Sequence, residues 1–593
     1  MNKTLPNKII NTDLCVIGGG LSGSFAALAA ARQGAKVVLI QDRPMLGGNA
    51  SSEIRMWISG SRGKNNMETG ILEEIMLENM RRNPTKNYYL WDSVLYDFVL
   101  REKNITLLLN CACMDADITN GDFADGRKVK INSVTGYQLT TQTMIEVEAK
   151  YFSDCSGDSI LAPLTGAEFR IGREAKTEFN EDTYVEKADD FTMGMSCLIQ
   201  GRETTRDVKF TAPSWSTKLT DEQVENRKPN IYDPTENYWY LELGGNRDTI
   251  HETEEITKDL VPLAIGMWDY IKNSGKYDAD KWELEFLGYL PGKRESRRMC
   301  GEYIITQRDI SYGVVFEDVI AYGGWPLDDH FPMGFYHVGT ANTDIQTPAP
   351  YTIPYRALYS KNVENLFFAG RNISMTHTAM SSIRVMATCA LLGQAVGVAA
   401  AIATKNSLTP NGVYKEKLSE LQNILLNADC FLPSKLREIS ESCKKAAPYK
   451  ELCDGFDRPH AIYNKETCGI KVKNGTEIKY TLENENVSDI HIVFDSDLER
   501  ETLSGHWCER QRSTRCNVLL NSPDLIVPKT LCKDFTLLIT DENGNTETLK
   551  YTENLKRAYD IPVNMKVKEI TLIPETNWGD SDTTAIFSFD FRN

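Results

Sequence analysis

The chain has 593 residues, too many for one ordinary hydrophobic core, so two or three domains are expected. Hydrophobic residues make up 41% and charged residues 25%, a balance typical of globular proteins in water. The 83 acidic residues outnumber the 66 basic ones, giving a formal net charge of -17. Such a charge opposes contact with a phosphate backbone, so nucleic acid is excluded as an expected partner.

Targeting, membrane and metal signals are weak. Residues 1–12 are polar and lead directly into an apolar strand, so a cytoplasmic location is expected, with export only if a leader was removed. Residues 385–403 are apolar, but they are rich in Ala and Gly and contain Gln394, which predicts a packed internal helix and no membrane span. None of the 14 cysteines forms a C-x-x-C motif, so no metal site is expected.

A glycine-rich turn near the start is the strongest local motif. Residues 14–20 form an apolar run that ends in glycine, and residues 21–32 have helical composition, which gives Gly18-x-Gly20-x-x-Gly23. Residues 36–40 supply a second strand. This context predicts a dinucleotide site in which the backbone approaches a pyrophosphate at a helix N-terminus. The alternative is a glycine turn that binds nothing.

The predicted helices and strands divide the rest of the chain into regions. Helices are expected at 67–82, 91–102 and 254–273, strands at 105–110 and within 128–155, a return strand at 365–369 and an apolar helix from 382. After 460, short alternating strands predominate, as at 477–482, 490–494, 535–539 and 568–573. The predicted domains are a discontinuous nucleotide-binding domain (1–165 and 351–410), a substrate domain (166–350), a helical linker (411–455) and a C-terminal β-sandwich (456–593).

The cofactor follows from the residues after the second strand. An acidic residue there normally holds the adenosine ribose, and here the place reads Gln41-Asp42-Arg43, so the Gln41 amide or Asp42 takes that role. A Gly47-Gly48 loop follows, which is frequent in large flavoproteins and changes the expected cofactor from NAD to FAD. A second glycine fingerprint for NAD(P)H is not visible, which favours direct substrate oxidation with an unknown electron acceptor.

Several motifs, in one order, resemble a bacterial family of FAD-dependent oxidoreductases. They are residues 47–57 (GGNASSEIRMW), 291–298 (PGKRESRR), 322–326 (YGGWP), 369–374 (AGRNIS) and 382–386 (SIRVM). The resemblance covers most of residues 10–410 and implies a glutathione-reductase-like, Rossmann-like α/β FAD domain with an inserted α+β substrate domain, related in plan to fumarate reductases. Residues 567–579 (VKEITLIPETNWG) resemble the end of a galactose-binding-like jelly roll.

The resemblance also implies cofactor contacts, residue by residue. The pyrophosphate is expected along Gly18, Gly20, Gly23, Gly48 and Asn49; the ribose at Gln41 or Asp42, beside Arg43; and the adenine near Cys111. Gly370 is expected at the ribityl chain, and the N-terminus of a helix at Ser382 and Ile383 at the pyrimidine end of the flavin. Arg371 stands where many flavoproteins have an acidic residue, so Asp158 is an alternative ribityl contact.

The candidate catalytic residues come from a small set. His377 and His330 are candidate bases for a substrate that loses a proton with its hydride, the alternative being oriented loop histidines without a chemical role. His460, His491 and His506 are expected to be surface or packing residues.

Charged residues near the glycine motifs are further candidates. Glu53 and Arg55 are expected on one face of a strand with Trp57, reaching the flavin or the substrate, the alternative being a structural ion pair. Arg294 and Arg297, with Arg298, are candidates to clamp a carboxylate or polar substrate, the alternative being solvated or inter-domain arginines.

These observations favour an FAD enzyme that oxidises a CH-OH group of a sugar or glycoside. The sugar rests on the appended sandwich and on Trp239, Trp268 and Trp325, which could stack on a sugar ring. One alternative is a carboxylate substrate, and another is a carbohydrate-binding protein with a vestigial flavin domain. A small-molecule partner is expected in the enzyme readings, and a homo-oligomer is compatible with the sequence. The acidic charge disfavours tRNA modification.

Overall fold

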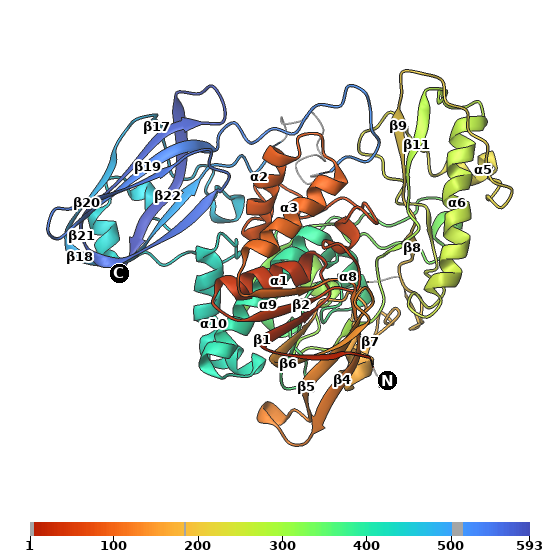
Figure 1. The fold of residues 1–593 in the computed structure, drawn as a ribbon, viewed down its shortest axis with the longest axis horizontal. Helices are drawn as coiled ribbons and strands as arrows, with labels where there is room; N and C mark the ends of the chain where they lie inside the picture. Colours follow the sequence, from red (N-terminus) through yellow and green to blue (C-terminus); the bar gives the residue numbers. More distant parts are fainter. Residues whose placement is uncertain (1–4, 183–184, 501–513) are drawn as a thin grey trace. The chain divides into compact units, whose positions relative to one another are not determined.

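The computed structural model describes residues 5–182, 185–500 and 514–593 (Figure 1). The chain forms two compact units, and each is built from separate stretches of sequence. The first unit comprises Met1–Ser61, Thr85–Leu418 and Gln511–Pro523, and the second comprises Arg62–Pro84, Ser419–Arg510 and Asp524–Asn593. His506 lies outside the described residues.

A mixed sheet forms the centre of the first unit, as predicted for a Rossmann-like FAD domain. Its strands run in the order β3-β2-β1-β6-β5-β4. The first four of these are mutually parallel, and β5 is antiparallel to both β6 and β4. The bounds are β1 (Asn7–Ile17), β2 (Val37–Ile40), β3 (Ile105–Leu108), β4 (Cys111–Asn120), β5 (Val129–Gln138) and β6 (Thr143–Asp154).

The predicted return to this sheet is present. Strand β16 (Leu366–Phe368) lies parallel to the end of β6, with Phe368 opposite Asp154. Sequence positions more than 200 residues apart therefore lie side by side at the carboxyl ends of β6 and β16. The segment that follows includes α8 (His377–Ile383) and α9 (Met386–Asn406).

Helix α9 is the long apolar segment that the sequence predicts to be internal. It is long and apolar enough to cross a membrane, but 94% of its apolar window is buried inside the protein, which is typical of a core helix. It packs on α1 (Leu21–Arg32) (Figure 1). A Cβ at Gly393 would lie 2.0 Å from the Ser22 carbonyl oxygen, and one at Gly397 would lie 2.3 Å from that of Ala26. Glycines at this spacing let the two backbones touch.

The inserted region is made of short strands and one long helix, α6 (Thr253–Asn273). Trp268 and Trp282 are fully buried in its core. Trp268 is therefore a packing residue, and its predicted stacking on a sugar is wrong. The remaining elements of the first unit are α3 (Tyr88–Arg101), α4 (Leu161–Thr165), β7 (Phe169–Arg170), β8 (Met195–Ser196), β9 (Ile199–Glu203), α5 (Asp221–Glu225), β10 (Glu242–Leu243), β11 (Trp282–Leu287), β12 (Gly292–Lys293), β13 (Arg298–Met299), α7 (Gln307–Ser311), β14 (Val319–Gly323) and β15 (Tyr351–Pro354).

The second unit contains a six-stranded antiparallel sheet in the order β17-β22-β18-β21-β19-β20. Helix α2 (Ile71–Arg82), from early in the chain, contributes Leu77 and Met80 to the hydrophobic core of this unit. The other bounds are α11 (Glu441–Ala446), β17 (Ile470–Lys473), β18 (Ile478–Phe494), β19 (Cys532–Asp541), β20 (Thr546–Tyr551), β21 (Ala558–Asn577) and β22 (Thr583–Arg592), and α10 (Pro410–Asn427) runs across the division at residue 418.

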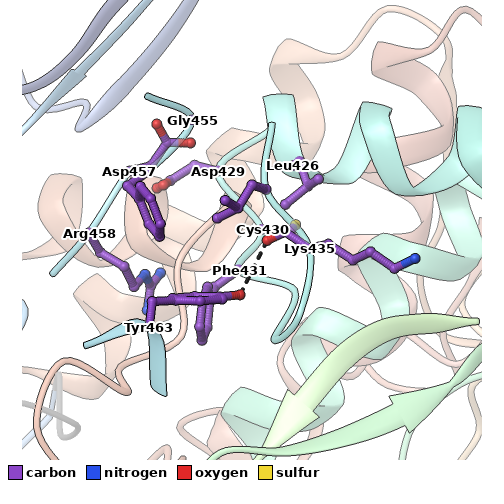
Figure 2. Close-up of a pocket in the computed structure, with 11 residues that line it drawn as sticks. Leu426, Asp429, Cys430, Phe431, Lys435, Gly455, Asp457, Arg458 and Tyr463 are labelled. Atoms are coloured by element: carbon purple, nitrogen blue, oxygen red, sulfur yellow. Dashed lines mark hydrogen bonds between the residues drawn. The ribbon is translucent and has the colours of Figure 1, made fainter. Parts of the chain in front are cut away.

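A small pocket lies within the second unit, between α10 and the segment before β17 (Figure 2). Asp429, Asp457 and Arg458, three charged residues that line it, already have protein partners. Arg458 donates to the carbonyls of Asn65 and Met67, at 3.1 and 2.9 Å, and Asp457 accepts from Arg437 at 2.8 Å. The nearby His460 is buried and stacks on Phe431, as a packing residue does. The polar groups of this pocket therefore serve the fold.

Two local expectations are wrong. Residues 51–57 are not a strand, because a turn closes from Ser51 to Arg55 (N···O 2.8 Å) and Arg55 has φ 66°, which breaks the alternation that would align Glu53, Arg55 and Trp57. Ser382 and Ile383 end α8 and do not begin a helix, since α9 starts at Met386.

The two units also divide the chain differently from the predicted domain boundaries. Residues 62–84 join the C-terminal unit, and residues 514–523, which lie between β18 and β19 in sequence, join the first unit. The finer boundaries at 165, 350, 410 and 455 stay predictions.

Candidate functional site

The glycine turn between β1 and α1 has one glycine that the fold does not need. A Cβ at Gly18, which has φ 103°, would lie 2.4 Å from the Cys155 carbonyl oxygen, and one at Gly23 would lie 1.8 Å from that of Gly18. A Cβ at Gly20 would meet only the Gly48 Cα, at 4.0 Å. Gly20 has an extended backbone and no side chain caps α1. The turn therefore leaves an open space in front of uncapped helix N–H groups, which is the cradle a pyrophosphate needs.

A second glycine loop closes one side of this cradle. The Gly47 N–H donates to the Gly19 carbonyl at 2.8 Å, and Gly48 has the left-handed φ of 58°. The Asn49 amide donates to the Lys293 carbonyl at 3.0 Å, which ties the loop to β12 in the inserted region. The structure thus brings the predicted pyrophosphate residues Gly18, Gly20, Gly23, Gly48 and Asn49 to one place.

The predicted ribose and adenine residues lie at the end of β2. Buried Gln41 accepts from the Gly19 N–H at 2.7 Å and donates to the Met45 carbonyl at 2.9 Å, so its amide already stabilises the glycine turn. Asp42 is exposed, 3.8 Å from Arg43. The Cys111 N–H donates to the Gln41 carbonyl, which places β4 next to this loop. Between the two ribose candidates, the side chain of Asp42 is the more accessible.

Asp158 is the centre of a polar cluster beside the return segment. It accepts from Arg371 at 2.7 Å, from Ser296 at 2.8 Å and from Lys293 at 2.9 Å. Burial alone would raise the pKa of Asp158, but Arg371 and Lys293 outweigh it and lower the pKa to about 2. Gly370, with φ 113°, immediately precedes Arg371. A ribityl contact from Asp158 stays a prediction.

Arg55 is a buried cation whose partners are neutral. It donates to Gln200 Oε1 at 2.8 Å, to the Ser52 carbonyl at 3.1 Å and to the Tyr89 hydroxyl at 3.3 Å, and it lies 4.1 Å above the Phe286 ring. No hydrogen bond joins it to Glu53 within the described residues, so the predicted alternative of an ion pair is wrong. Burial raises the pKa of Glu53.

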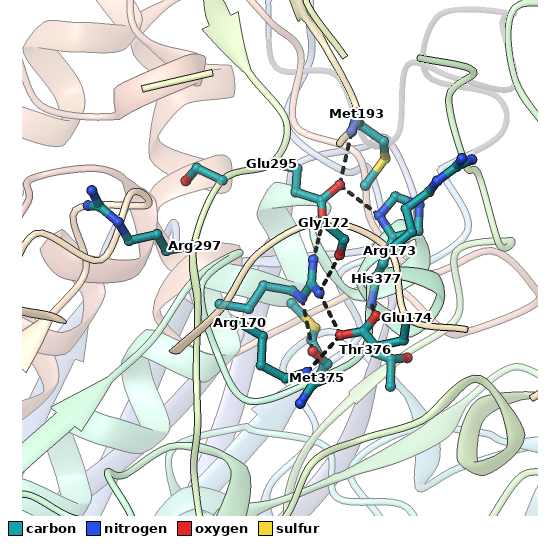
Figure 3. Close-up of polar contacts among 12 residues, drawn as sticks. Arg170, Gly172, Arg173, Glu174, Met193, Glu295, Arg297, Met375, Thr376 and His377 are labelled. Carbon is teal, nitrogen blue, oxygen red and sulfur yellow. Dashed lines mark hydrogen bonds and ion pairs between the residues drawn. The ribbon is translucent and has the colours of Figure 1, made fainter. Parts of the chain in front are cut away.

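His377, at the start of α8, lies between the carboxylates of Glu295 and Asp329; Figure 3 shows its contact with Glu295. Its Nδ1 is 2.8 Å from Glu295 Oε2, and its Nε2 is 3.0 Å from Asp329 Oδ1. Burial lowers the pKa of His377, but the two carboxylates more than offset this and raise the pKa to about 10. His377 is therefore a cation at neutral pH. It can accept a proton from a substrate only after it has released one.

The same network contains a fully buried arginine. Arg298 pairs with Glu295 and, at 2.7 Å, with Glu174. The other carboxylate oxygen of Glu174 accepts a hydrogen bond from the backbone N–H of His377 (Figure 3). Arg297, half-buried, donates to the Asp158 carbonyl at 3.3 Å. These contacts join the 291–298 motif to the return segment.

His330 lies in a second network. Its Nδ1 is 2.5 Å from Glu242 Oε2, and its Nε2 is 3.4 Å from Asp328 Oδ1. Arg294 is also buried and contacts Glu242 at 3.3 Å. The Trp239 ring stands edge-on to His330, with centroids 5.1 Å apart. The Nε2 contact is long, so this nitrogen is the less tightly held of the two.

The sequence analysis missed the acidic half of both networks. Arg384 binds Asp328 at 3.0 Å, so Asp328 and Arg384 belong to the network of His330. The neighbouring Asp329 and Glu295 belong to the network of His377. Only Glu242 carried a local signal, because it stands in the apolar run YLELG at residues 240–244. The missed residues are Glu174, Glu242, Glu295, Asp328, Asp329 and Arg384.

Ser382 is bound at the far end of α8. Its hydroxyl lies 2.7 Å from the Tyr351 hydroxyl and donates to the Trp325 carbonyl. Ser382 and Ile383 are both fully buried. A role for them at the flavin stays a prediction, now without the helix N-terminus that suggested it.

Comparison with known proteins identifies the family. Residues 13–425 match the family described as FAD dependent oxidoreductase, which is more than half of the chain.

The chain belongs to this family.

FAD is therefore the cofactor of this oxidoreductase. The residues present fit FAD, and the open cradle at Gly20 is the first observation that supports this fit. Buried polar atoms without hydrogen-bond partners in the described chain are a second, at the loops that flank the cradle. They are Arg43 Nη1, Ser51 Oγ, Glu53 Oε2, Arg371 Nε and Asn372 Oδ1.

Short matches link the flavoenzyme to curated proteins. A stretch of 66 residues is 39% identical to glycerol-3-phosphate dehydrogenase of Mycobacterium leprae (strain TN), covering 11% of each chain. The glycerol-3-phosphate dehydrogenase 2 of Mycobacterium tuberculosis (strain ATCC 25618 / H37Rv) matches equally. The chain thus matches about a tenth of the length of these relatives.

Solved structures resemble it only loosely. A quinol fumarate reductase subunit of E. coli aligns over 71% of this chain and 75% of its own, with 11% identity and a TM-score of 0.28. The glycerol-3-phosphate dehydrogenase from Bacillus halodurans complexed with FAD aligns over 34% and 43%, with 15% identity and a TM-score of 0.20.

Proposed function

We propose that this FAD-dependent oxidoreductase oxidises a CH-OH group of a neutral polyhydroxylated substrate, a sugar or a glycoside. The observation that carries the proposal is the environment of His330: a carboxylate at 2.5 Å from Nδ1, a loosely held Nε2, and the half-buried Trp239 beside the ring. When bound, FAD supplies the two-electron acceptor for the hydride. The protein must then take up the hydroxyl proton.

His330 is the residue that we assign to this proton transfer. Nε2 accepts the proton from the substrate hydroxyl, and Glu242 stabilises the imidazolium through Nδ1. His377 is less suited to the same task because both of its nitrogens already hold carboxylates at 3.0 Å or less. We assign it the role of a fixed positive charge.

The arginines of the 291–298 motif support a neutral substrate. Arg298 is fully buried between two carboxylates, and Arg294 contacts Glu242, Ser196 and the Trp239 carbonyl. Neither guanidinium has the free planar edge that a bidentate carboxylate clamp requires. Trp239 and Trp325 remain half-buried, and the Trp325 indole donates to Asp328 at 3.1 Å.

Arg55 favours a second candidate, a carboxylate or phosphate substrate. Arg55 is buried and, among the described residues, hydrogen-bonds only to neutral groups, while the carboxylates of Asp92 and Glu285 interact with its charge from farther away. An anionic group of a substrate that accepted from Arg55 directly would stabilise this buried charge further. The short matches to glycerol-3-phosphate dehydrogenases, enzymes whose named substrate carries both a hydroxyl and a phosphate, support the same candidate.

The test is anaerobic bleaching of the yellow protein. We expect aldoses or glycosides to bleach it, and His330→Gln to slow bleaching by about 10²- to 10⁴-fold while the protein stays yellow. His337→Gln is the matched control, because His337 stacks on Phe331 in the same region. Bleaching by dicarboxylates or glycerol phosphate alone would replace the sugar with the second candidate. A colourless protein that FAD cannot reconstitute would contradict both.

A further inference from the structure

The first unit includes a segment from the C-terminal part of the sequence. We call residues 514–523 the strap; in sequence they lie between β18 and β19 of the second unit. The Val518 N–H donates to the Gly201 carbonyl and the Val518 carbonyl accepts from the Glu203 N–H, both at 2.8 Å. These bonds form a parallel bridge to β9, which also pairs with β11. The strap thus extends a small sheet of the first unit.

Asn517 holds the strap by its side chain. It is fully buried, and its Oδ1 accepts from the Gly201 N–H at 3.0 Å. Its Nδ2 lies 3.2 Å from each of three backbone carbonyls, those of Asn230, Ile231 and Asp233. One amide group therefore joins β9 to the loop 230–238, which leads directly into Trp239.

The strap continues by hydrogen bonds to Arg55. The Arg515 carbonyl accepts from Gln200 Nε2 at 3.3 Å, and Gln200 Oε1 accepts from Arg55 Nη1 at 2.8 Å. Gln200 is buried on β9, and Phe286 of β11 lies under the Arg55 guanidinium at 4.1 Å. Arg55 itself has the left-handed φ of 66°, which neighbouring contacts must maintain.

We propose that Asn517 is a positioning residue of the flavin site, which acts through Gln200 to hold the Arg55 cation beside the glycine loop. The proposal rests on the proposed placement of Arg55 at the flavin or substrate. It gives the C-terminal region a role in the oxidoreductase itself, separate from any binding of carbohydrate. Removing the Asn517 amide leaves the Gly201 N–H and three carbonyls without this partner and frees β9 to shift.

The experiment measures the midpoint potential of FAD in the full-length protein, with a chemical reductant. Reduced FAD carries more negative charge, which a fixed Arg55 stabilises. We expect Asn517→Ala and Gln200→Ala each to weaken the preference for reduced FAD about tenfold, which is a potential about 30 mV more negative. The double variant is expected to match the larger single effect, because both residues act through Arg55.

Leu520→Ala is the matched control, since Leu520 lies on the strap with 55% of its surface exposed. Its potential should equal that of the wild type. Unchanged potentials in both test variants, with a lowered unfolding temperature, would reduce Asn517 to a structural residue and overturn the proposal. If Asn517→Ala does not fold, Gln200→Ala decides alone. Because no substrate is used, failure of the sugar or phosphate assignment leaves this result intact.

Discussion

Replacing His377 with glutamine tests the strongest electrostatic claim about this protein. The carboxylates of Glu295 and Asp329, at 2.8 and 3.0 Å, raise the pKa of His377 from 6.5 to about 10. At 1.36 kcal/mol per pH unit, the interval from pH 7 to the folded pKa of about 10 makes folding more favourable by about 4 kcal/mol at pH 7. The loss of one partner from a buried ion pair generally lowers the free energy of unfolding by about 3–5 kcal/mol, which agrees with the value worked out for His377.

The pH dependence of this stabilisation follows from the direction of the pKa shift of His377. Because the folded pKa lies above the unfolded one, the stabilisation is complete below pH 6.5 and is lost as the pH rises through about 10. We therefore expect the gap between wild type and His377→Gln to shrink by about 1.4 kcal/mol per pH unit between pH 7 and 9. Urea unfolding of the FAD-bound protein, followed by tryptophan fluorescence, measures the gap.

A surface pair provides the control. His251 contacts Asp248 at 2.7 Å, but 70% of its side chain is exposed, so His251→Gln should change stability by less than about 1 kcal/mol. Equal stability of His377→Gln and wild type would refute the reasoning, as would a gap that stays constant from pH 7 to 9.

Three further predictions concern the cofactor site. Gly20→Ala should fold normally, since the new Cβ lies 4.0 Å from its nearest neighbour. We expect the variant to bind FAD at least about tenfold more weakly in a flavin-fluorescence titration, because the Cβ occupies the space of the pyrophosphate. Wild-type affinity would show that the pyrophosphate does not lie at this position. Gly23→Ala, whose Cβ would lie 1.8 Å from the Gly18 oxygen, should lose the fold by circular dichroism, and a native spectrum would contradict the tight turn. Asp158→Asn should lower the free energy of unfolding by about 2 kcal/mol at neutral pH, because the folded pKa of Asp158, about 2, lies below the ordinary Asp pKa of 3.8. This stabilisation is present above pH 3.8 and is lost toward pH 2. An acid-unfolding curve that is the same for the variant and the wild type would argue against the polar cluster.

Local patterns predicted the elements of the nucleotide fold correctly. The turn at Gly18, the two helices α3 and α6 and the return strand β16 are all present near their expected positions. Helix α9 was also predicted as internal, because its small residues suit backbone contact better than lipid. In each case the information lies within about 20 consecutive residues, where periodicity and glycine placement act directly on the backbone.

The two buried charge networks could not be predicted in the same way. His377 meets Glu295 and Asp329, which lie 82 and 48 residues away in sequence. The pattern around Arg294 and Arg298 indicated charge but not its partners, so a substrate clamp and a solvated surface were the readings considered. Full burial excludes a solvated position for Arg298, and its charge is balanced by Glu174 and Glu295.

The sequence by itself determined the family, FAD as the cofactor, and the β-strands of the C-terminal region. Only the tertiary structure decided that α2 packs in the C-terminal unit, that Asn517 belongs to the first unit, and that His377 is a buried cation. The physical reason is that periodicity and composition report whether a segment will be buried. Which distant backbone or carboxylate it meets depends on close packing and on satisfying every buried polar group, and both are properties of the whole fold.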